Sequence, residues 1–322
     1  MWLWESRLSG TTTFTTYQSV RSHQFAVSLL VEFIGVTLFS FLGSTVKDPI
    51  LGPIVNGLAL AVLIYTAANI SGGHLNPAVT ISTLLCGFYP LIHSILYICL
   101  QVAGGIVGSL LAAGLLPATR VGMGAAGPGC FEPPIDEVSV QGLTRGQLFG
   151  WEVVMTFTLI SVVYACGIAK PGHGRRVGGR DSLLFTPLVV GLTLTACAGT
   201  GGRWTGAALN PARVAGPAVV FRCSAGYWWM YILAEGLAAL LACCVFAFVS
   251  GWGPLSPVAS RSKYRLTSAE AARLWVTGSP PPRLRGREGD NMEDVVERLE
   301  RDNDAKASAA QDIAASPAGA GP

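Results

Sequence analysis

Six apolar stretches constrain this chain more than any other feature of its sequence. They cover about residues 25–45, 51–69, 90–116, 147–168, 183–200 and 227–250. A helix needs about 20 mainly apolar residues to cross the hydrocarbon core of a bilayer, and each stretch is close to that length. Only 13% of the residues are charged, whereas soluble domains carry about 25%. The sequence therefore predicts an all-α membrane protein with six transmembrane helices.

Two further apolar segments, about 76–88 and 210–221, are only half as long. Each begins with an Asn-Pro-Ala box, formed by Asn76, Pro77 and Ala78 in the first segment and by Asn210, Pro211 and Ala212 in the second. Asn is a good N-cap, and Pro is favoured at the first helical position, where its missing N–H costs nothing. Each segment is therefore predicted to be a half-length helix that begins abruptly at its Asn.

The sequence around the two boxes is repeated. The segment "SGGHLNPA" at 71–78 aligns without a gap with "TGAALNPA" at 205–212, and Glu32 and Glu152 each stand early in the first long stretch of their half. Residues 25–116 and 147–250 are thus predicted to be two repeats. Because each repeat crosses the membrane three times, the second must be inverted relative to the first. Inverted repeats place the functional site where they meet, near the midplane.

Two half-helices that enter from opposite faces meet N-terminus to N-terminus, and each brings a partial charge of about +0.5. Small residues in the preceding loops allow backbone carbonyls to face a narrow lumen, and we expect this carbonyl track at Gly72, Gly73, His74, Gly206 and Ala208. The two Asn amides would donate to a water at the centre and interrupt a proton wire. With the charge of Arg213, this predicts a pore that excludes protons and cations.

Basic residues in the loops predict the orientation. The loop 169–182 contains Lys170, Arg175, Arg176 and Arg180, whereas the loop 117–146 contains two Arg against three acidic residues. The excess of Lys and Arg on cytoplasmic loops places the 169–182 loop and both termini in the cytoplasm. We expect a cytoplasmic N-terminal segment at 1–24, a channel domain at 25–251, and a mostly disordered cytoplasmic tail at 252–322, where Pro, Arg, Ala and acidic residues predominate.

The two boxes, the Arg directly after the second box and the Glu near the head of each half resemble the aquaporin (major intrinsic protein) family over about residues 25–250. The resemblance is strongest to plant and green-algal members, particularly the tonoplast type. It implies a right-handed helical bundle, a homotetramer with one pore per subunit, passive conduction of water and no cofactor. We interpret Glu32 and Glu152 as structural carboxylates that hold backbone N–H groups of the facing loop, the alternative being a proton relay.

By spacing from the boxes, the resemblance assigns the selectivity constriction to Asn56, Ala198, Ala207 and Arg213. Strict water channels of the family typically carry an aromatic residue at the position of Asn56 and His at that of Ala198. Without these bulky groups the constriction should be wider, so we predict that a small neutral solute such as glycerol, urea, ammonia or hydrogen peroxide also passes. Specialised glycerol members usually carry Asp where this chain has Val214, which argues against a dedicated glycerol facilitator.

Several alternatives stay open. A secondary active transporter can also use inverted repeats, but it would need a titratable midplane site, and Glu32, Glu152 and Glu235 lie outside the two boxes. Glu235 stands in the last span, where the family usually has a Gly-Pro pair. His173, in the 169–182 loop, is a candidate pH-sensitive gate. The membrane is either the plasma membrane or the vacuolar membrane.

Other classes of function are not expected. The eight Cys lack metal-binding spacing, so no metal site is predicted, and a net charge of +3 is too small to indicate a nucleic-acid partner. The sequence has no hydrolytic or redox motif, and no enzymatic activity is expected. The predicted partners are water, small neutral solutes and the lipid bilayer.

Overall fold

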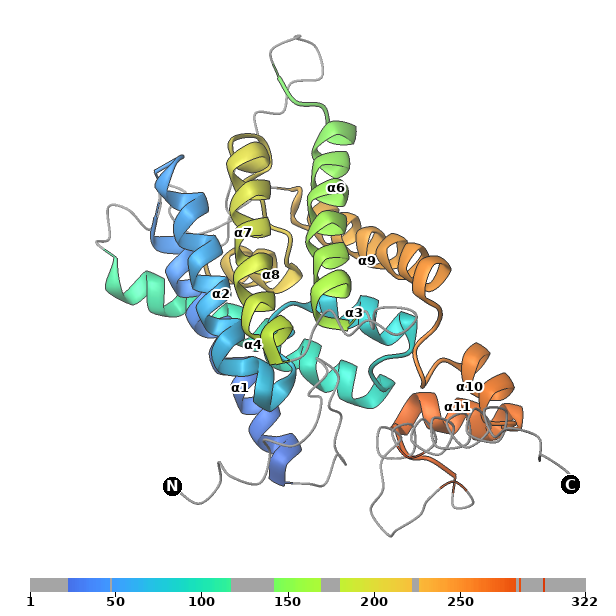
Figure 1. Ribbon diagram of the computed structural model, residues 1–322. Helices are drawn as coiled ribbons and strands as arrows, with labels where there is room; N and C mark the ends of the chain where they lie inside the picture. Colours follow the sequence, from blue (N-terminus) through green and yellow to red (C-terminus); the bar gives the residue numbers. More distant parts are fainter. Residues whose placement is uncertain are drawn as a thin grey trace, which may run out of the picture.

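The computed structural model describes residues 23–46, 48–116, 142–168, 180–221 and 226–281, together with Leu284 and Arg298. Six helices in these ranges are long and apolar enough to cross a membrane. They are α1 (His23–Thr45), α2 (Leu51–Ser71), α4 (Leu91–Leu115), α6 (Arg145–Val163), α7 (Arg180–Thr205) and α9 (Trp228–Ser250) (Figure 1). A π-helical turn, Tyr164–Ile168, continues α6. The six predicted spans are thus confirmed, and α7 runs further at both ends than expected.

The two short helices are α3 (Pro77–Cys86) and α8 (Pro211–Phe221). Each packs against the last long helix of the other repeat, α3 on α9 and α8 on α4, while α2 packs on α7. Within the repeats, α1 packs on α4 and α6 on α9. The two halves therefore interlock and bury a single centre, which is the arrangement expected of an inverted repeat.

Small residues allow the helices from different repeats to approach closely. A Cβ added to Gly57 on α2 would overlap the Thr195 side chain and the Gly191 carbonyl of α7. A Cβ on Gly105 of α4 would overlap the carbonyl of Ala212 on α8 in the same way. Close backbone approach through small residues is the usual means of helix association in a bilayer, where lipid removes the hydrophobic driving force.

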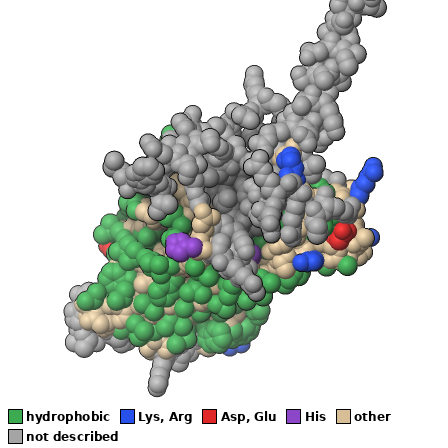
Figure 2. Space-filling model, turned by 90° about the horizontal axis from the view of Figure 1, so that it is seen from below, with side chains coloured by type: hydrophobic (Ala, Val, Ile, Leu, Met, Phe, Trp, Pro, Cys, Tyr) green, Lys and Arg blue, Asp and Glu red, His purple; other side chains and the backbone are tan. Residues whose placement is uncertain are grey.

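The outer surface of the spans is apolar. Leu58 and Val62 on α2 and Leu192 on α7 are more than half exposed, as is required of side chains that face lipid or a neighbouring subunit. Figure 2 views the molecule from below and shows hydrophobic side chains over most of the described bundle. Charged side chains are seen mainly on the right of this view.

The structure describes the first part of the tail, where two helices form within the segment 252–322 that was expected to be mostly disordered. The segment after α9 forms α10 (Pro257–Lys263) and α11 (Ser268–Thr277), at the same end of the bundle as the start of α1 (Figure 1). A capping box, in which Thr267 and Glu270 bond each other's backbone N–H groups, begins α11, and Leu274 is fully buried. The composition concealed this local helix signal. Most residues after 281, and residues 1–22, lie outside those that the structure describes.

The ordered part of the tail docks on the end of the first half-helix. Gly253 N–H donates to the Cys86 carbonyl at 2.8 Å, and Leu255 N–H donates to the Gly87 carbonyl at 2.9 Å. The side chains of the docked segment then close a buried apolar cluster with residues of α1 and α4 and of the loop between α3 and α4: Phe25, Tyr89, Tyr97, Leu255, Tyr264, Leu266, Ala271 and Leu274. The tail therefore contributes to the core at this end of the bundle.

Candidate pore

The Asn of each box caps its half-helix. Asn76 Oδ1 accepts a hydrogen bond from Ala78 N–H at 2.8 Å, and Asn210 Oδ1 accepts one from Ala212 N–H at 3.0 Å. The proline that follows each Asn occupies the first helical position, where it displaces no hydrogen bond. Each half-helix therefore begins at its Asn, and the N-terminal ends of α3 and α8 point toward each other.

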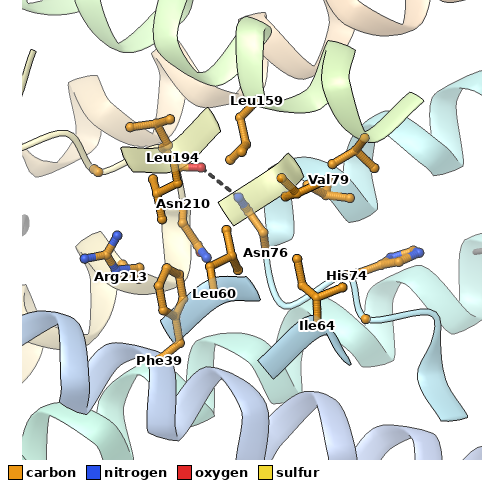
Figure 3. Close-up of a pocket in the computed structure, with 15 residues that line it drawn as sticks. Phe39, Leu60, Ile64, His74, Asn76, Val79, Leu159, Leu194, Asn210 and Arg213 are labelled. Atoms are coloured by element: carbon orange, nitrogen blue, oxygen red, sulfur yellow. Dashed lines mark hydrogen bonds between the residues drawn. The ribbon is translucent and has the colours of Figure 1, made fainter. Parts of the chain in front are cut away.

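The same two side chains also join the repeats. Asn76 Nδ2 donates to the Leu209 carbonyl at 2.7 Å (Figure 3), and Asn210 Nδ2 donates to the Leu75 carbonyl at 2.8 Å. An Asn amide has two N–H donors, so each side chain retains one for a molecule in the lumen. This leaves two donors side by side at the point where the half-helix N-termini meet.

A buried carboxylate holds the loop before each box. Glu32 accepts hydrogen bonds from the Ser71 hydroxyl at 2.6 Å, from His74 N–H at 3.0 Å and from Leu75 N–H at 2.7 Å. Gln101 Nε2 donates a fourth bond to it at 2.8 Å. With four donors directed at it, this carboxylate is bound to the loop and offers no free oxygen pair to a passing ion.

Glu152 repeats the arrangement in the second half. It accepts hydrogen bonds from the Thr205 hydroxyl at 2.6 Å, Ala208 N–H at 3.2 Å and Leu209 N–H at 3.1 Å. These donors stand in the aligned repeat where Ser71, His74 and Leu75 stand in the first. Both carboxylates are fully buried. Because the last two N–H groups of each loop turn toward its carboxylate, the loop carbonyls can face the other way.

The backbone of the two loops is strained where these carbonyls turn. Leu75, Ala207 and Leu209 have φ of 48°, 49° and 51°, values in the left-handed region that non-glycine residues seldom adopt. Strain of this kind persists only where the surroundings enforce it, and it is concentrated at functional sites. Here the carboxylates and the crossed Asn bonds supply the enforcement.

A narrow cavity, with a volume of about 20 Å³ for the centre of a water-sized sphere, lies at the junction of the half-helices (Figure 3). It is lined by Phe39, Leu60, Ile64, Gly73, His74, Asn76, Val79, Leu159, Val163, Val190, Leu194, Ala208, Leu209, Asn210 and Arg213. Gly73, His74 and Ala208 of the expected carbonyl track are in this lining. Gly72 and Gly206 are not: their N–H groups bond the carbonyls of Ala68 at 3.1 Å and Gly202 at 2.9 Å, so they end α2 and α7.

Of the two histidines singled out from the sequence, the structure describes His74 but not the candidate gate, His173. His74 lines the cavity, its Nδ1 lies 3.1 Å from the Thr80 hydroxyl, and its ring packs 5.0 Å from that of Tyr89. The ring is therefore fixed in orientation beside the lumen. His173 lies outside the residues that the structure describes, as do Lys170, Arg175 and Arg176.

Two residues of the expected constriction are in direct contact. Arg213 is buried, and its Nη2 donates to Asn56 Oδ1 at 2.5 Å. Asn56 is itself fixed, because its Nδ2 donates to the Gly52 carbonyl at 2.8 Å. On another side, the Arg213 guanidinium lies 4.4 Å from the centroid of the Phe39 ring, a cation–π contact. The guanidinium is thus held between α1 and α2.

The other two constriction residues contribute only methyl groups. Ala207 is buried in the loop before α8 and belongs to the apolar core, and Ala198 on α7 is half-buried against the same core. Neither side chain can narrow the lumen as an imidazole or phenyl ring would. A constriction formed by these four residues would be polar on the side of Asn56 and Arg213 and small and apolar on the other, although only Arg213 is among the residues that line the cavity.

Most of the apolar residues that line the cavity were not predicted from the sequence. These residues come in pairs four positions apart, such as Leu60 with Ile64 and Val190 with Leu194, and so occupy one face of a helix. A signal was available for Phe39, which stands two helical turns after Glu32 and faces the same way. For the others, an inward-facing Leu cannot be distinguished by sequence from a lipid-facing one.

The chain is similar in sequence to known proteins. The sequence matches the Major intrinsic protein family over residues 19–246. It is 32% identical to Aquaporin A of Dictyostelium discoideum over 67% of this chain and 73% of that protein. It is 30% identical to the probable aquaporin TIP1-2 of Oryza sativa subsp. japonica over 70% of this chain and 86% of that protein.

A solved structure shares the fold. The aquaglyceroporin from Plasmodium falciparum superposes with a TM-score of 0.57 and 24% identity, covering 69% of this chain and 95% of that one. Six membrane-spanning helices around a cavity, with two capped half-helices joined at its centre, define a membrane channel of the inverted-repeat type. More particularly, the extent of the family match shows that this chain belongs to the major intrinsic protein family.

Proposed function

We propose that the protein is a passive channel for water that also conducts small neutral solutes. The Asn76 and Asn210 amides support this role, because a water between them must offer its oxygen to two donors. Such a water cannot pass a proton along the file, and the half-helix N-termini repel cations. The relatives that match over two thirds of the chain are named as aquaporins, which agrees with the proposal.

The contact between Asn56 and Arg213 is the main support for the proposal that small neutral solutes pass through the pore. An aromatic ring at the position of Asn56 would close the lumen beside the guanidinium, whereas Asn56 is drawn to the wall by its bonds to Arg213 and to the Gly52 carbonyl. The opposite wall has only the methyl groups of Ala198 and Ala207. A passage that is wide and polar on one side suits glycerol, urea, ammonia or hydrogen peroxide, which are small and can form hydrogen bonds.

Stopped-flow light scattering of proteoliposomes tests the proposal, first with an impermeant osmolyte and then with each neutral solute. Ala198→His should reduce glycerol and urea flux strongly and water flux much less, because the ring restores bulk at the constriction. Leu192→Ala, on the exposed side of the same helix, is the matched control and should change neither flux. Unchanged solute flux in Ala198→His would show that the constriction has been misplaced.

The alternative of a secondary active transporter finds less support. Glu32 and Glu152 are occupied by loop hydrogen bonds, so they are positioned as structural carboxylates and not as exchangeable ion ligands. Repeating the osmotic measurement with and without a proton or sodium gradient separates the two classes. A flux that requires the gradient would reject a passive pore.

The remaining proposals concern assembly and membrane. We infer a homotetramer with both termini in the cytoplasm of a plasma or vacuolar membrane, supported by the apolar outer faces of α1 and α2 and by the basic 169–182 loop. Native mass spectrometry in detergent and protease protection of sealed vesicles test these points. His173→Ala tests the candidate gate, since a gate there requires that the acid sensitivity of water flux disappear in this variant.

A further inference from the structure

Glu235 is a third buried carboxyl group whose role the pore geometry above leaves unexplained. It lies on α9, is fully buried, and neither of its oxygens makes a hydrogen bond of normal geometry within the described structure. The backbone N–H of Asn210, at the start of the second half-helix, is nevertheless directed toward it. A buried carboxyl group without a hydrogen-bonded partner is costly, so its presence requires an explanation.

The inverted repeat identifies the counterpart of Glu235. The Tyr97 hydroxyl on α4 donates to the Ser71 carbonyl at 2.9 Å, and the Tyr231 hydroxyl on α9 donates to the Thr205 carbonyl at 2.6 Å, each over a separation of 26 residues. These matched bonds fix the register of α4 against α9. One helical turn further along, α4 carries Gln101 and α9 carries Glu235. Glu235 therefore occupies the place of Gln101.

Gln101 connects the first carboxylate to the first half-helix. Its Nε2 donates to Glu32 at 2.8 Å and lies 3.1 Å from the Thr80 hydroxyl of α3. In the second repeat the partner of Thr80 is Val214, which has no hydroxyl. An ionised Glu235 in this place could neither donate to Glu152 nor bond to α8 through Val214, whereas a protonated Glu235 keeps one O–H donor.

The charges around Glu235 also favour its neutral form. The charged or titratable groups that face it are Glu152 from α6, Arg213 from α8 and Tyr231 from its own helix. One guanidinium can balance one of the two carboxylates, and Glu152 already has three donors. If Glu235 keeps its proton, the buried cluster is electrically neutral, but if it ionises, the cluster carries one excess negative charge in a medium that disfavours it.

We propose that Glu235 is a positioning residue that is protonated while the pore excludes ions. Its neutral carboxyl group supports the second half-helix, as the Gln101 amide supports the first. Loss of this proton to solvent at high pH would place a second negative charge beside Arg213 and the N-terminus of α8. That charge offsets the positive field that excludes cations. This inference rests on the proposed function as an ion-excluding channel and adds a pH limit to it.

The experiment compares wild type, Glu235→Gln and Glu235→Leu in proteoliposomes, with water flux and potassium conductance measured from acid to alkaline pH. Gln reproduces the neutral acid in shape, so Glu235→Gln should keep water flux within about twofold of wild type at neutral pH. Wild type should develop a potassium leak as the pH is raised, and Glu235→Gln should show none. Glu235→Leu leaves the Asn210 N–H without a polar neighbour and should lower water flux by about fivefold or more.

Two results would overturn the proposal: a wild type that stays tight to potassium at alkaline pH, or an alkaline leak that persists in Glu235→Gln. If Glu235→Leu does not fold, the comparison of the other two proteins still decides. Water flux of the wild type at neutral pH is read in the same vesicles and tests the proposed function separately, because a protein that conducts water without an alkaline leak refutes only the role of Glu235.

Discussion

Asn76 and Asn210 each donate an amide N–H to the carbonyl of the residue that precedes the other, at distances of 2.7 Å to Leu209 and 2.8 Å to Leu75. The bonds cross between loops that are far apart in the sequence and belong to different repeats. Neither repeat can complete the centre of the pore alone. The same side chain therefore caps its own half-helix, binds the opposite loop and presents a donor to the lumen.

Asn210→Asp tests this triple role. The carboxylate can still cap α8, but it has no N–H for the Leu75 carbonyl and adds a negative charge between the half-helices. One buried acceptor left without its donor costs about 1–3 kcal/mol, so the thermal midpoint in detergent should fall. Potassium or proton conductance should rise, as measured in voltage-clamped oocytes. An Asp variant that remains as tight to ions as the wild type would contradict the proposed mechanism of exclusion.

Glu152→Gln tests the carboxylate that shapes the second loop. A carboxylate accepts all three of its hydrogen bonds, whereas the Gln amide offers one oxygen and turns an N–H₂ toward a backbone donor. At least one loop N–H becomes unpaired, at about 1–3 kcal/mol, and water flux should fall with stability. Thr158→Ala, at an exposed position on the same helix, is the control and should leave both unchanged. Equal water flux in Glu152→Gln and Thr158→Ala would show that the pore does not need this carboxylate.

The sequence predicted the six spans, the two half-helices and the inverted repeat because each rests on a local signal. Length and apolar composition define a span, and the Asn-Pro pair defines where a half-helix begins. The bonds of Glu32 and Glu152 follow from the same repeat, since a buried carboxylate at matching positions must find donors in the facing loop.

Other features depend on contacts that no local pattern records. The bond between Asn56 and Arg213 joins two helices from different repeats, and nothing in either segment indicates that Asn56 turns to the guanidinium. Gly72 and Gly206 read as part of the carbonyl track because they are small, but their φ of 89° and 81° ends the preceding helices. In the tail, the composition around 252–281 indicated disorder, and only the capping box of α11 signalled the helix that docks.

Gly57→Ala tests the close contact of α2 with α7. The added methyl group would overlap the Thr195 side chain and the Gly191 carbonyl, and overpacking of this kind costs about 1–3 kcal/mol. Gly150→Ala on α6 is the matched control, because a Cβ there meets nothing within 4 Å. The thermal midpoint should fall in Gly57→Ala and stay the same or rise in Gly150→Ala, where alanine is the better helix former. Similar midpoints would mean that the two helices separate easily.

The local stability of the turn between α1 and α2 should depend on pH through Asp48. Its carboxylate accepts hydrogen bonds from the N–H groups of Ile50 at 2.9 Å and Leu51 at 2.7 Å, and these bonds lower its pKa below the ordinary 3.8. A lowered pKa means that the charged form stabilises the fold, so this contribution is present above the ordinary pKa and is lost as the pH falls through the lower folded value. Amide exchange at Ile50 and Leu51, followed by mass spectrometry, should therefore accelerate under strong acid in the wild type.

Asp48→Asn is the control for that measurement, since its amide oxygen can accept the same bonds but does not titrate in this range. After correction for the intrinsic pH dependence of exchange, protection in this variant should stay constant where the wild type loses it. Because Asp48 is fully exposed, the effect is expected to stay local to the turn. A parallel loss of protection in both proteins would place the acid-sensitive group elsewhere.

Leu274→Ala tests the docking of the tail. Leu274 is fully buried in the cluster that α11 forms with Tyr89 and Tyr97, and the Trp275 indole N–H adds a bond to the Leu84 carbonyl at 3.3 Å. Removing a buried Leu side chain costs about 2–5 kcal/mol, which should release α11 while the six spans remain folded. Limited proteolysis in detergent should then cut within 253–281 much faster than in the wild type. Arg273→Ala, one position away on the exposed face, should be cut at the wild-type rate, and equal rates in both variants would show that α11 is not held by its apolar side.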